Sequence, residues 1–180
     1  IGLFIIHRQS ARRGYLLLFL ATYLALLIGW RGLAPFPFPI YPIFMLVNAF
    51  IGTLPFLLDR LLRKRLGDGF ANTLVFPLVG TALEFLTVGS GPLGSFGAAA
   101  YTQHAIAPLG QLASVGGLWA ISFLVTWFAS VLYWAVDRHL AGEAYIRGAL
   151  ACALAVGLAL GWGGWRLQGA ASGEVDQMVT

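Results

Sequence analysis

The side chains in this sequence that could do chemistry are few, and they are set in long apolar runs. Glu84 is the one formally charged residue between positions 69 and 136. A carboxylate in so apolar a stretch is costly unless it faces a cavity or a partner, so it is a candidate functional group. An interhelical hydrogen bond, or a carboxylate that reaches the lipid headgroups, is the alternative. Hydrogen-bonding side chains follow at Tyr101, Gln103 and Gln111, and we predict that they line a site together with Glu84.

The residue types give little support to a nucleophilic site or a metal site. A nucleophilic site would need Cys152 to meet a base such as Lys64 or Glu84, but the elements predicted below place these three apart. His104 has no second His, Cys or carboxylate at ligand spacing, so we expect no metal site. We also expect no cofactor, and no catalytic residue within this chain.

Composition indicates a polytopic membrane protein. Of the 180 residues, 59% are hydrophobic and 10% are charged, whereas a globular chain carries about 25% charged residues. The net charge of +4 comes from basic residues placed between hydrophobic runs. Such residues orient membrane spans, so we do not expect nucleic-acid binding.

The apolar runs predict an all-α fold, a transmembrane helix bundle over residues 1–168. We expect five spans at about residues 14–34, 42–58, 71–88, 111–136 and 148–165, each long enough for a bilayer. Residues 1–6 are expected to be the end of a further helix, so sequence that precedes them is expected to be missing. Residues 59–68 and 137–147 are predicted to be charged loops, and residues 169–180 a linker towards an extracytoplasmic domain outside this chain.

The distribution of basic residues predicts the orientation. Five spans alternate sides, so the amino-terminal segment and both charged loops share one face, which carries nine of the eleven Lys and Arg residues. By the positive-inside rule this face is cytoplasmic. Residues 89–110 and the carboxyl terminus are then extracytoplasmic. The nine residues are Arg8, Arg12, Arg13, Arg60, Arg63, Lys64, Arg65, Arg138 and Arg147.

The spacing of polar residues within the apolar segment 76–134 resembles that of apolipoprotein N-acyltransferases, a nitrilase-related family. The matching motifs are Glu84-Phe85, the triplet at 101–103, Gln111-Leu112-Ala113, and Gly117 followed by residues 122–125. Two departures stand out: residues 86–87 are Leu-Thr where many members have Leu-Arg, and residues 95–97 are Ser-Phe-Gly where many have Phe-Pro-Trp. The resemblance therefore points to a divergent branch and leaves the acyl donor and acceptor open.

The resemblance implies a bacterial inner-membrane enzyme that moves an acyl chain from a phospholipid to the amino terminus of a lipoprotein. In the family, seven spans precede an extracytoplasmic nitrilase-like domain that carries a Glu–Lys–Cys triad. That triad would lie outside the present residues, so we expect this chain to be the membrane-anchoring and lipid-access part, inactive alone. Its partners would be the phospholipid bilayer and the lipoprotein substrate.

A different class of function stays open at this point. A chain of this length could be a small-solute-binding membrane subunit of a transporter, with Glu84 and the following segment around the solute. A structural membrane protein without a ligand is a third possibility. A stop codon soon after residue 180 would favour the transporter, and a soluble stretch with separated Glu, Lys and Cys would favour the acyltransferase.

Overall fold

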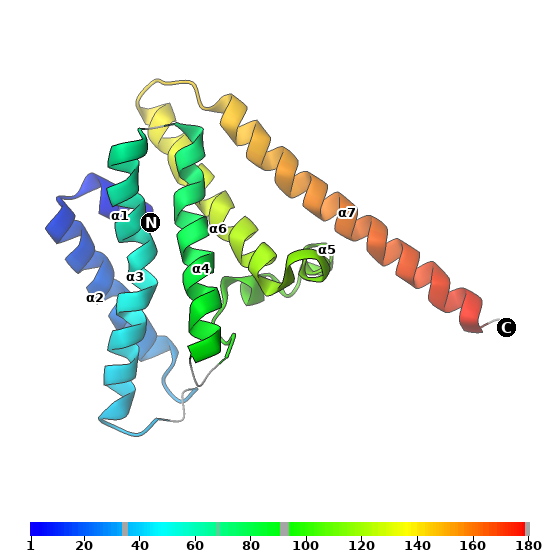
Figure 1. The fold of residues 1–180 in the computed structure, drawn as a ribbon, viewed down its shortest axis with the longest axis horizontal. Helices are drawn as coiled ribbons and strands as arrows, with labels where there is room; N and C mark the ends of the chain where they lie inside the picture. The colour runs from blue at the N-terminus through cyan, green and yellow to red at the C-terminus, as the bar shows by residue number, and fades with distance from the viewer. Residues whose placement is uncertain (34–35, 68, 91–93, 179–180) are drawn as a thin grey trace. The chain divides into compact units, whose positions relative to one another are not determined.

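The fold is helical, as predicted. The computed structural model describes residues 1–33, 36–67, 69–90 and 94–178. Helices make up 82% of it, and no strand occurs in the described residues. The elements in order are α1 (Gly2–Arg8), α2 (Ala11–Gly29), α3 (Ile40–Leu66), η1 (Phe70–Leu74), α4 (Val75–Ser90), η2 (Ala99–Gln103), α5 (Ala107–Gly110), α6 (Ala113–Leu140) and α7 (Ile146–Met178) (Figure 1).

Five helices in the described residues are long and apolar enough to cross a membrane, which confirms the prediction of a five-span bundle. They are Ala11–Gly29, Ile40–Arg63, Phe70–Val88, Ala113–Leu140 and Ile146–Gly169. They have 19 to 28 residues each, and about 17–25 residues are enough to span a bilayer. The third combines η1 with α4.

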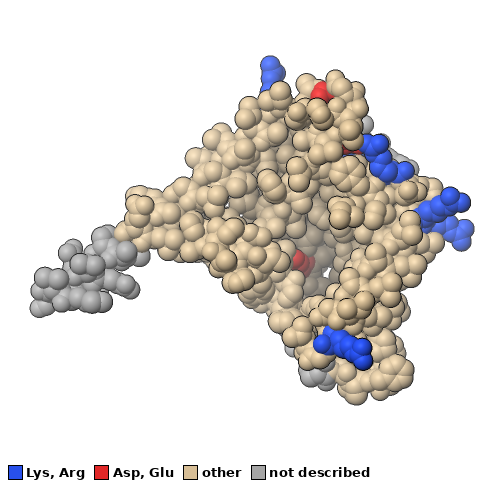
Figure 2. Space-filling view, turned by 180° about the vertical axis from the view of Figure 1, so that it is seen from behind, with Lys and Arg blue, Asp and Glu red and all other residues tan. Residues whose placement is uncertain are grey.

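The surface is consistent with lipid as the solvent. Large apolar side chains are exposed along every span; Leu158 of α7, for example, is 64% exposed. On the face drawn in Figure 2, charged side chains form a few separate spots on a surface that is otherwise uncharged. Exposure of so much apolar surface is unfavourable in water and not in a bilayer, whose core also requires the backbone hydrogen bonds that helices supply.

The chain divides into two compact units, Ile1–Gly80 and Thr81–Thr180, with the boundary inside α4. In the first unit, α1 packs against both α2 and α3. Leu3 and Ile6 of α1 are buried, together with Met45 and Ala49 of α3. The helix expected at residues 1–6 is present as α1 and contributes to the core.

A buried polar cluster joins α1 to α3. The carboxylate of Asp59 is fully buried, and its Oδ2 lies 2.7 Å from Nε2 of His7. The same oxygen lies 3.7 Å from Nε of Arg63, one helical turn further along α3. An ionised group is tolerated away from water when partners of opposite charge or hydrogen-bond donors surround it.

The prediction of a charged loop at residues 59–68 is wrong, and this cluster explains why. Instead, α3 continues through these residues to Leu66 and ends at Gly67, whose φ of +79° favours glycine. The guanidinium of Arg60 donates to the carbonyl oxygens of Ile6 and Gln9, which lie at the end of α1. Carbonyl groups at a helix end lack intrahelical partners, so the charged residues of this turn join two helices instead of forming a loop.

In the second unit, η2, α5 and the first turns of α6 gather around a small core. Ala100, Leu109 and Ile121 are its buried members, and Leu160 of α7 packs against them. The helix α7 contacts both α5 and α6 and continues to Met178 (Figure 1). Residues 169–178 are thus helical; the prediction that they link to a further domain stays a prediction.

Replacement of Asp59 by Ala should destabilise the first unit strongly. The substitution removes the carboxylate that faces His7 and Arg63, and loss of one partner of a buried ion pair costs about 3–5 kcal/mol. Unfolding in detergent, followed by circular dichroism, measures the loss. Arg12→Gln is the control, because Arg12 is exposed at the start of α2. Equal stability of the two variants would contradict a structural role for Asp59.

Candidate functional site

The connection between the third and fourth spans contains two short helices. Its described part, residues 94–110, forms η2 and α5, joined by a turn at His104 and Ala105. The amide of Tyr101 bonds to the carbonyl of Ala98, which closes the first turn of η2. The amides of Ala99 and Ala100 precede that bond and need partners from elsewhere.

Glu84 and Ser122 supply those partners. The Oε1 atom of Glu84, on α4, accepts the amide of Ala99 at 3.1 Å. The Oγ atom of Ser122, on α6 and fully buried, accepts the amide of Ala100 at 3.1 Å. Two side chains from different helices thus complete the first turn of η2, a role that side chains usually fill locally at helix starts.

Glu84 retains one oxygen without a bond. Its Oε2 atom is buried and has no hydrogen-bond partner among the described residues. A buried carboxylate oxygen is unfavourable unless a polar group bonds to it. The alternative of a hydrogen bond between elements therefore accounts for Oε1, and not for the whole side chain.

The other predicted site residues are close in sequence but do not converge. Tyr101 is 49% exposed, and its hydroxyl lies 2.8 Å from Oγ of Ser95. The amide nitrogen of Gln103 donates to Oγ1 of Thr102 at 3.0 Å. Gln111 lies in the turn between α5 and α6, where its carbonyl accepts the hydroxyl of Ser114.

A break interrupts α6 near its start. Gly116 and Gly117 leave helical geometry, and Gly117 has a φ of +63°, a conformation that L side chains rarely adopt. The predicted span at residues 111–136 thus contains a turn at Gln111, a break, and a regular helix from Leu118 onwards. Ser122 lies one turn into that regular part, where it reaches η2.

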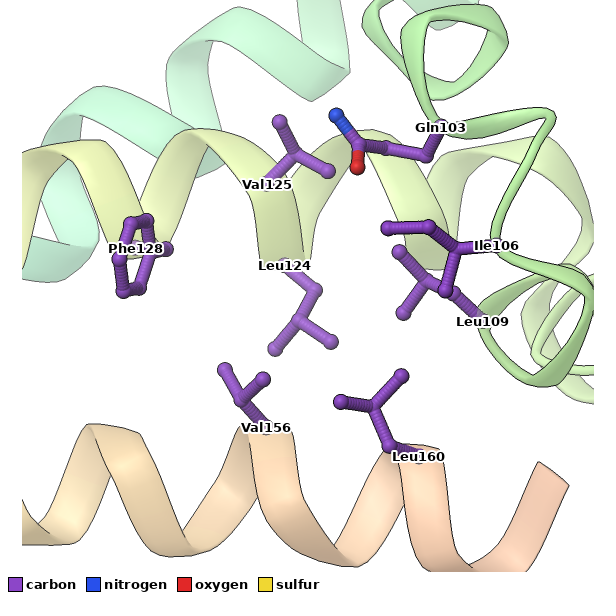
Figure 3. A pocket seen from close by; sticks show the side chains of 8 residues that line it. All are labelled: Gln103, Ile106, Leu109, Leu124, Val125, Phe128, Val156 and Leu160. Carbon is purple, nitrogen blue, oxygen red and sulfur yellow. The ribbon is translucent and has the colours of Figure 1, made fainter. Parts of the chain in front are cut away.

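A pocket of about 280 Å³ lies between η2, α5, α6 and α7 (Figure 3). Gln103 is its one polar lining residue, and Glu84, Tyr101 and Gln111 do not line it. The other lining residues could not be recognised from the sequence, because they are ordinary apolar residues of the predicted spans or of the connection between them. The lining residues are Gln103, Ile106, Leu109, Leu124, Val125, Phe128, Val156 and Leu160. No three His, Cys, Asp or Glu side chains gather as metal ligands in the part of the chain that the structure describes.

The close approach of α7 to α5 sets one end of this pocket. Gly163 of α7 is buried against Pro108, and a Cβ atom there would overlap the carbonyl oxygen of Pro108. Beside this contact, the guanidinium of Arg166 donates to Oγ of Ser114 and stacks 5.2 Å from the ring centre of Trp162. Small residues permit such approaches between helices in lipid.

The comparisons with known proteins now decide the family. A protein-family model described as the apolipoprotein N-acyltransferase N-terminal domain matches residues 1–131. The chain therefore belongs to the apolipoprotein N-acyltransferase N-terminal domain family. The match confirms the resemblance found in residues 76–134 and extends it to the first helices. No curated protein and no solved structure matches the chain significantly.

Within this family domain, all four predicted site residues lie in the matched part, as do Ser122 and the pocket residues of α6. The residues of α7 that line the pocket, Val156 and Leu160, follow it. The pocket therefore combines family-matched elements with the helix that comes after them.

Replacement of Gly163 by Ala should displace α7 from α5. The added methyl group meets backbone atoms of Pro108 that cannot rotate away, and such overpacking costs about 1–3 kcal/mol. Gly164→Ala is a matched control, because a Cβ at Gly164 meets nothing within 4 Å and Ala stabilises a helix by up to about 1 kcal/mol over Gly. Thermal unfolding in detergent distinguishes them, and a Gly163→Ala variant as stable as Gly164→Ala would refute the close contact.

Proposed function

We propose that this chain is the membrane-anchoring and lipid-access part of an apolipoprotein N-acyltransferase, an enzyme that moves an acyl chain from a phospholipid to the amino terminus of a lipoprotein. Family membership supports the enzyme class. The five apolar helices fit a lipid bilayer as surroundings. The catalytic triad of such an enzyme would lie outside the present residues, so the contribution of this chain is to bind and present lipid.

One observation carries the role of the site: the Glu84 and Ser122 side chains hold η2 by its first amides. This attachment fixes Gln103, the last residue of η2, at the pocket. Glu84 is then a positioning residue whose second oxygen remains open to a polar ligand group. Tyr101 and Gln111 flank the same segment and would meet the polar part of a substrate outside the pocket.

The second class considered, a solute-binding transporter subunit, gains no support from these observations. Its site would need several polar groups around one cavity. The pocket has a single polar lining residue, and the family match points to acyl transfer. We therefore propose no transport function.

Replacement of Glu84 by Ala in the protein as the cell makes it should lower acyl transfer to a lipopeptide. Loss of the bond to Ala99 lets η2 move, and a misplacement of about 1 Å at a positioning element can reduce a rate by about a hundredfold. Glu84→Gln keeps an oxygen for the Ala99 amide and should restore much of the rate. Leu78→Ala, an exposed change on α4, is the control.

The transfer rates of these variants distinguish a requirement for the negative charge from one for the hydrogen bond. A Gln variant as slow as the Ala variant would assign the requirement to the negative charge and not to the hydrogen bond. Unchanged transfer in both Glu84 variants and in Gln103→Leu would remove the site from the reaction.

The proposed setting is the bacterial inner membrane, with residues 94–110 and the carboxyl terminus on the extracytoplasmic side. The distribution of Lys and Arg in the sequence supports it. Reporter fusions after residues 68, 110 and 180 should report the cytoplasmic, extracytoplasmic and extracytoplasmic sides respectively. A cytoplasmic result at residue 180 would contradict this orientation and the place proposed for the enzyme's soluble domain.

A further inference from the structure

The pocket between η2, α5, α6 and α7 has the chemistry of a hydrocarbon site. Seven of its eight lining residues are apolar, and Gln103 is the exception. A charged or strongly hydrated ligand would lose its water there without gaining a partner of opposite charge, which is unfavourable. An apolar ligand with at most one or two polar atoms near Gln103 fits the lining.

The rim of the pocket is continuous with the surface that faces lipid. Phe128 lines the pocket and is also 53% exposed. Leu132, one turn further along the same face of α6, is exposed as well. Since both helices are membrane spans, a ligand reaches the pocket from the hydrocarbon layer and not from water.

The size and polarity of the pocket define the ligand further. A volume of about 280 Å³ lies just below the range of about 300–1,000 Å³ typical of small-molecule sites. This space suits a segment of one acyl chain and excludes a whole phospholipid with two chains and a headgroup. Gln103 lies at the η2 side of the pocket. Phe128 and Val156 lie on the side away from Gln103, one helical turn beyond Leu124 on α6 and Leu160 on α7 (Figure 3).

We propose that this pocket holds one acyl chain of a membrane phospholipid, with its ester end towards Gln103 and its methyl end towards Phe128 and Val156. The assignment builds on the proposed function, because it names the part of the lipid that this chain would present. The amide of Gln103 donates to Thr102 through one of its two hydrogens, which leaves the other for an ester carbonyl. Phe128 and Val156 then limit the length of chain that fits.

Photo-crosslinking tests the occupant directly. The protein as the cell makes it is placed in vesicles of phosphatidylethanolamine and phosphatidylglycerol that contain a phosphatidylethanolamine with a diazirine at the end of one acyl chain. After irradiation, peptide mapping should find the label on residues 124–128 and 156–160. Val156→Phe fills the pocket and should reduce the label there to the level of ordinary lipid-facing residues. Leu158→Phe, a change of equal kind on the exposed face of α7, should leave it unchanged.

The other outcomes overturn the assignment. Label spread evenly over exposed residues of α6 and α7, or pocket labelling that Val156→Phe does not reduce, would mean that no chain is bound there. If Val156→Phe fails to fold, Val156→Ala decides: a deeper pocket should shift the strongest labelling to a longer-chain probe, and no shift would reject the proposal.

The labelling experiment separates this proposal from the function it builds on. Crosslinking needs no acyl transfer, so a localised label without any transfer to a lipopeptide would retain the pocket and reject the enzyme function. Acyl transfer that depends on Glu84, without a localised label, would retain the enzyme function and reject the pocket assignment.

Discussion

The second unit depends on how two backbone amides are satisfied. The N–H groups of Ala99 and Ala100 begin a five-residue helix in a strongly apolar part of the chain. A buried amide without a partner is costly, so η2 is stable only if other elements accept both. Glu84 and Ser122 do so from α4 and α6. The position of Gln103, of the turn that follows, and of α5 is a consequence of these two bonds.

The bond from Glu84 does not by itself explain why a carboxylate is present. The side-chain oxygen of a glutamine would accept the Ala99 amide as well, and without the cost of a charge in an apolar region. What glutamate adds is the negative charge and a second acceptor, and that second oxygen is buried without a partner among the described residues. Ser122 brings no charge, and its single side-chain oxygen accepts the Ala100 amide. The two side chains thus hold η2 in the same way, and Glu84 differs in the acceptor that its bond to Ala99 does not use.

The sequence was sufficient for features that depend on composition and insufficient for those that depend on contacts between distant segments. The spans followed from apolar length, because a bilayer imposes that length on any helix. The end of α3 did not follow from the sequence. Asp59 and Arg60 bond to residues at the end of α1, about fifty residues away, and no local sequence pattern indicates those contacts. The break at Gly117 was hidden because glycine is compatible with a helix and with its interruption.

The residues of the candidate site were likewise predictable from the sequence only in part. Glu84 was recognisable as an isolated carboxylate, whereas its counterpart Ser122 was one of several hydroxyl residues in an apolar helix and became distinct only through its bond to Ala100. Of the polar residues chosen from the sequence, Gln103 reaches the pocket because it ends η2 on that side. Tyr101, two residues earlier on the same short helix, is directed to Ser95 instead. Direction on a helix so short is fixed by its attachment, and the attachment is tertiary.

The width of the pocket is also set by backbone contacts. In a bilayer the hydrophobic effect does not drive helices together, because the lipid chains are as apolar as the side chains. Close packing and polar bonds must hold α7 in place, and the structure has both at one end: Gly163 against Pro108, and Arg166 to Ser114. Leu160 lies one turn from Gly163 and Val156 about one turn beyond, so this fixed contact determines how far both stand from α6.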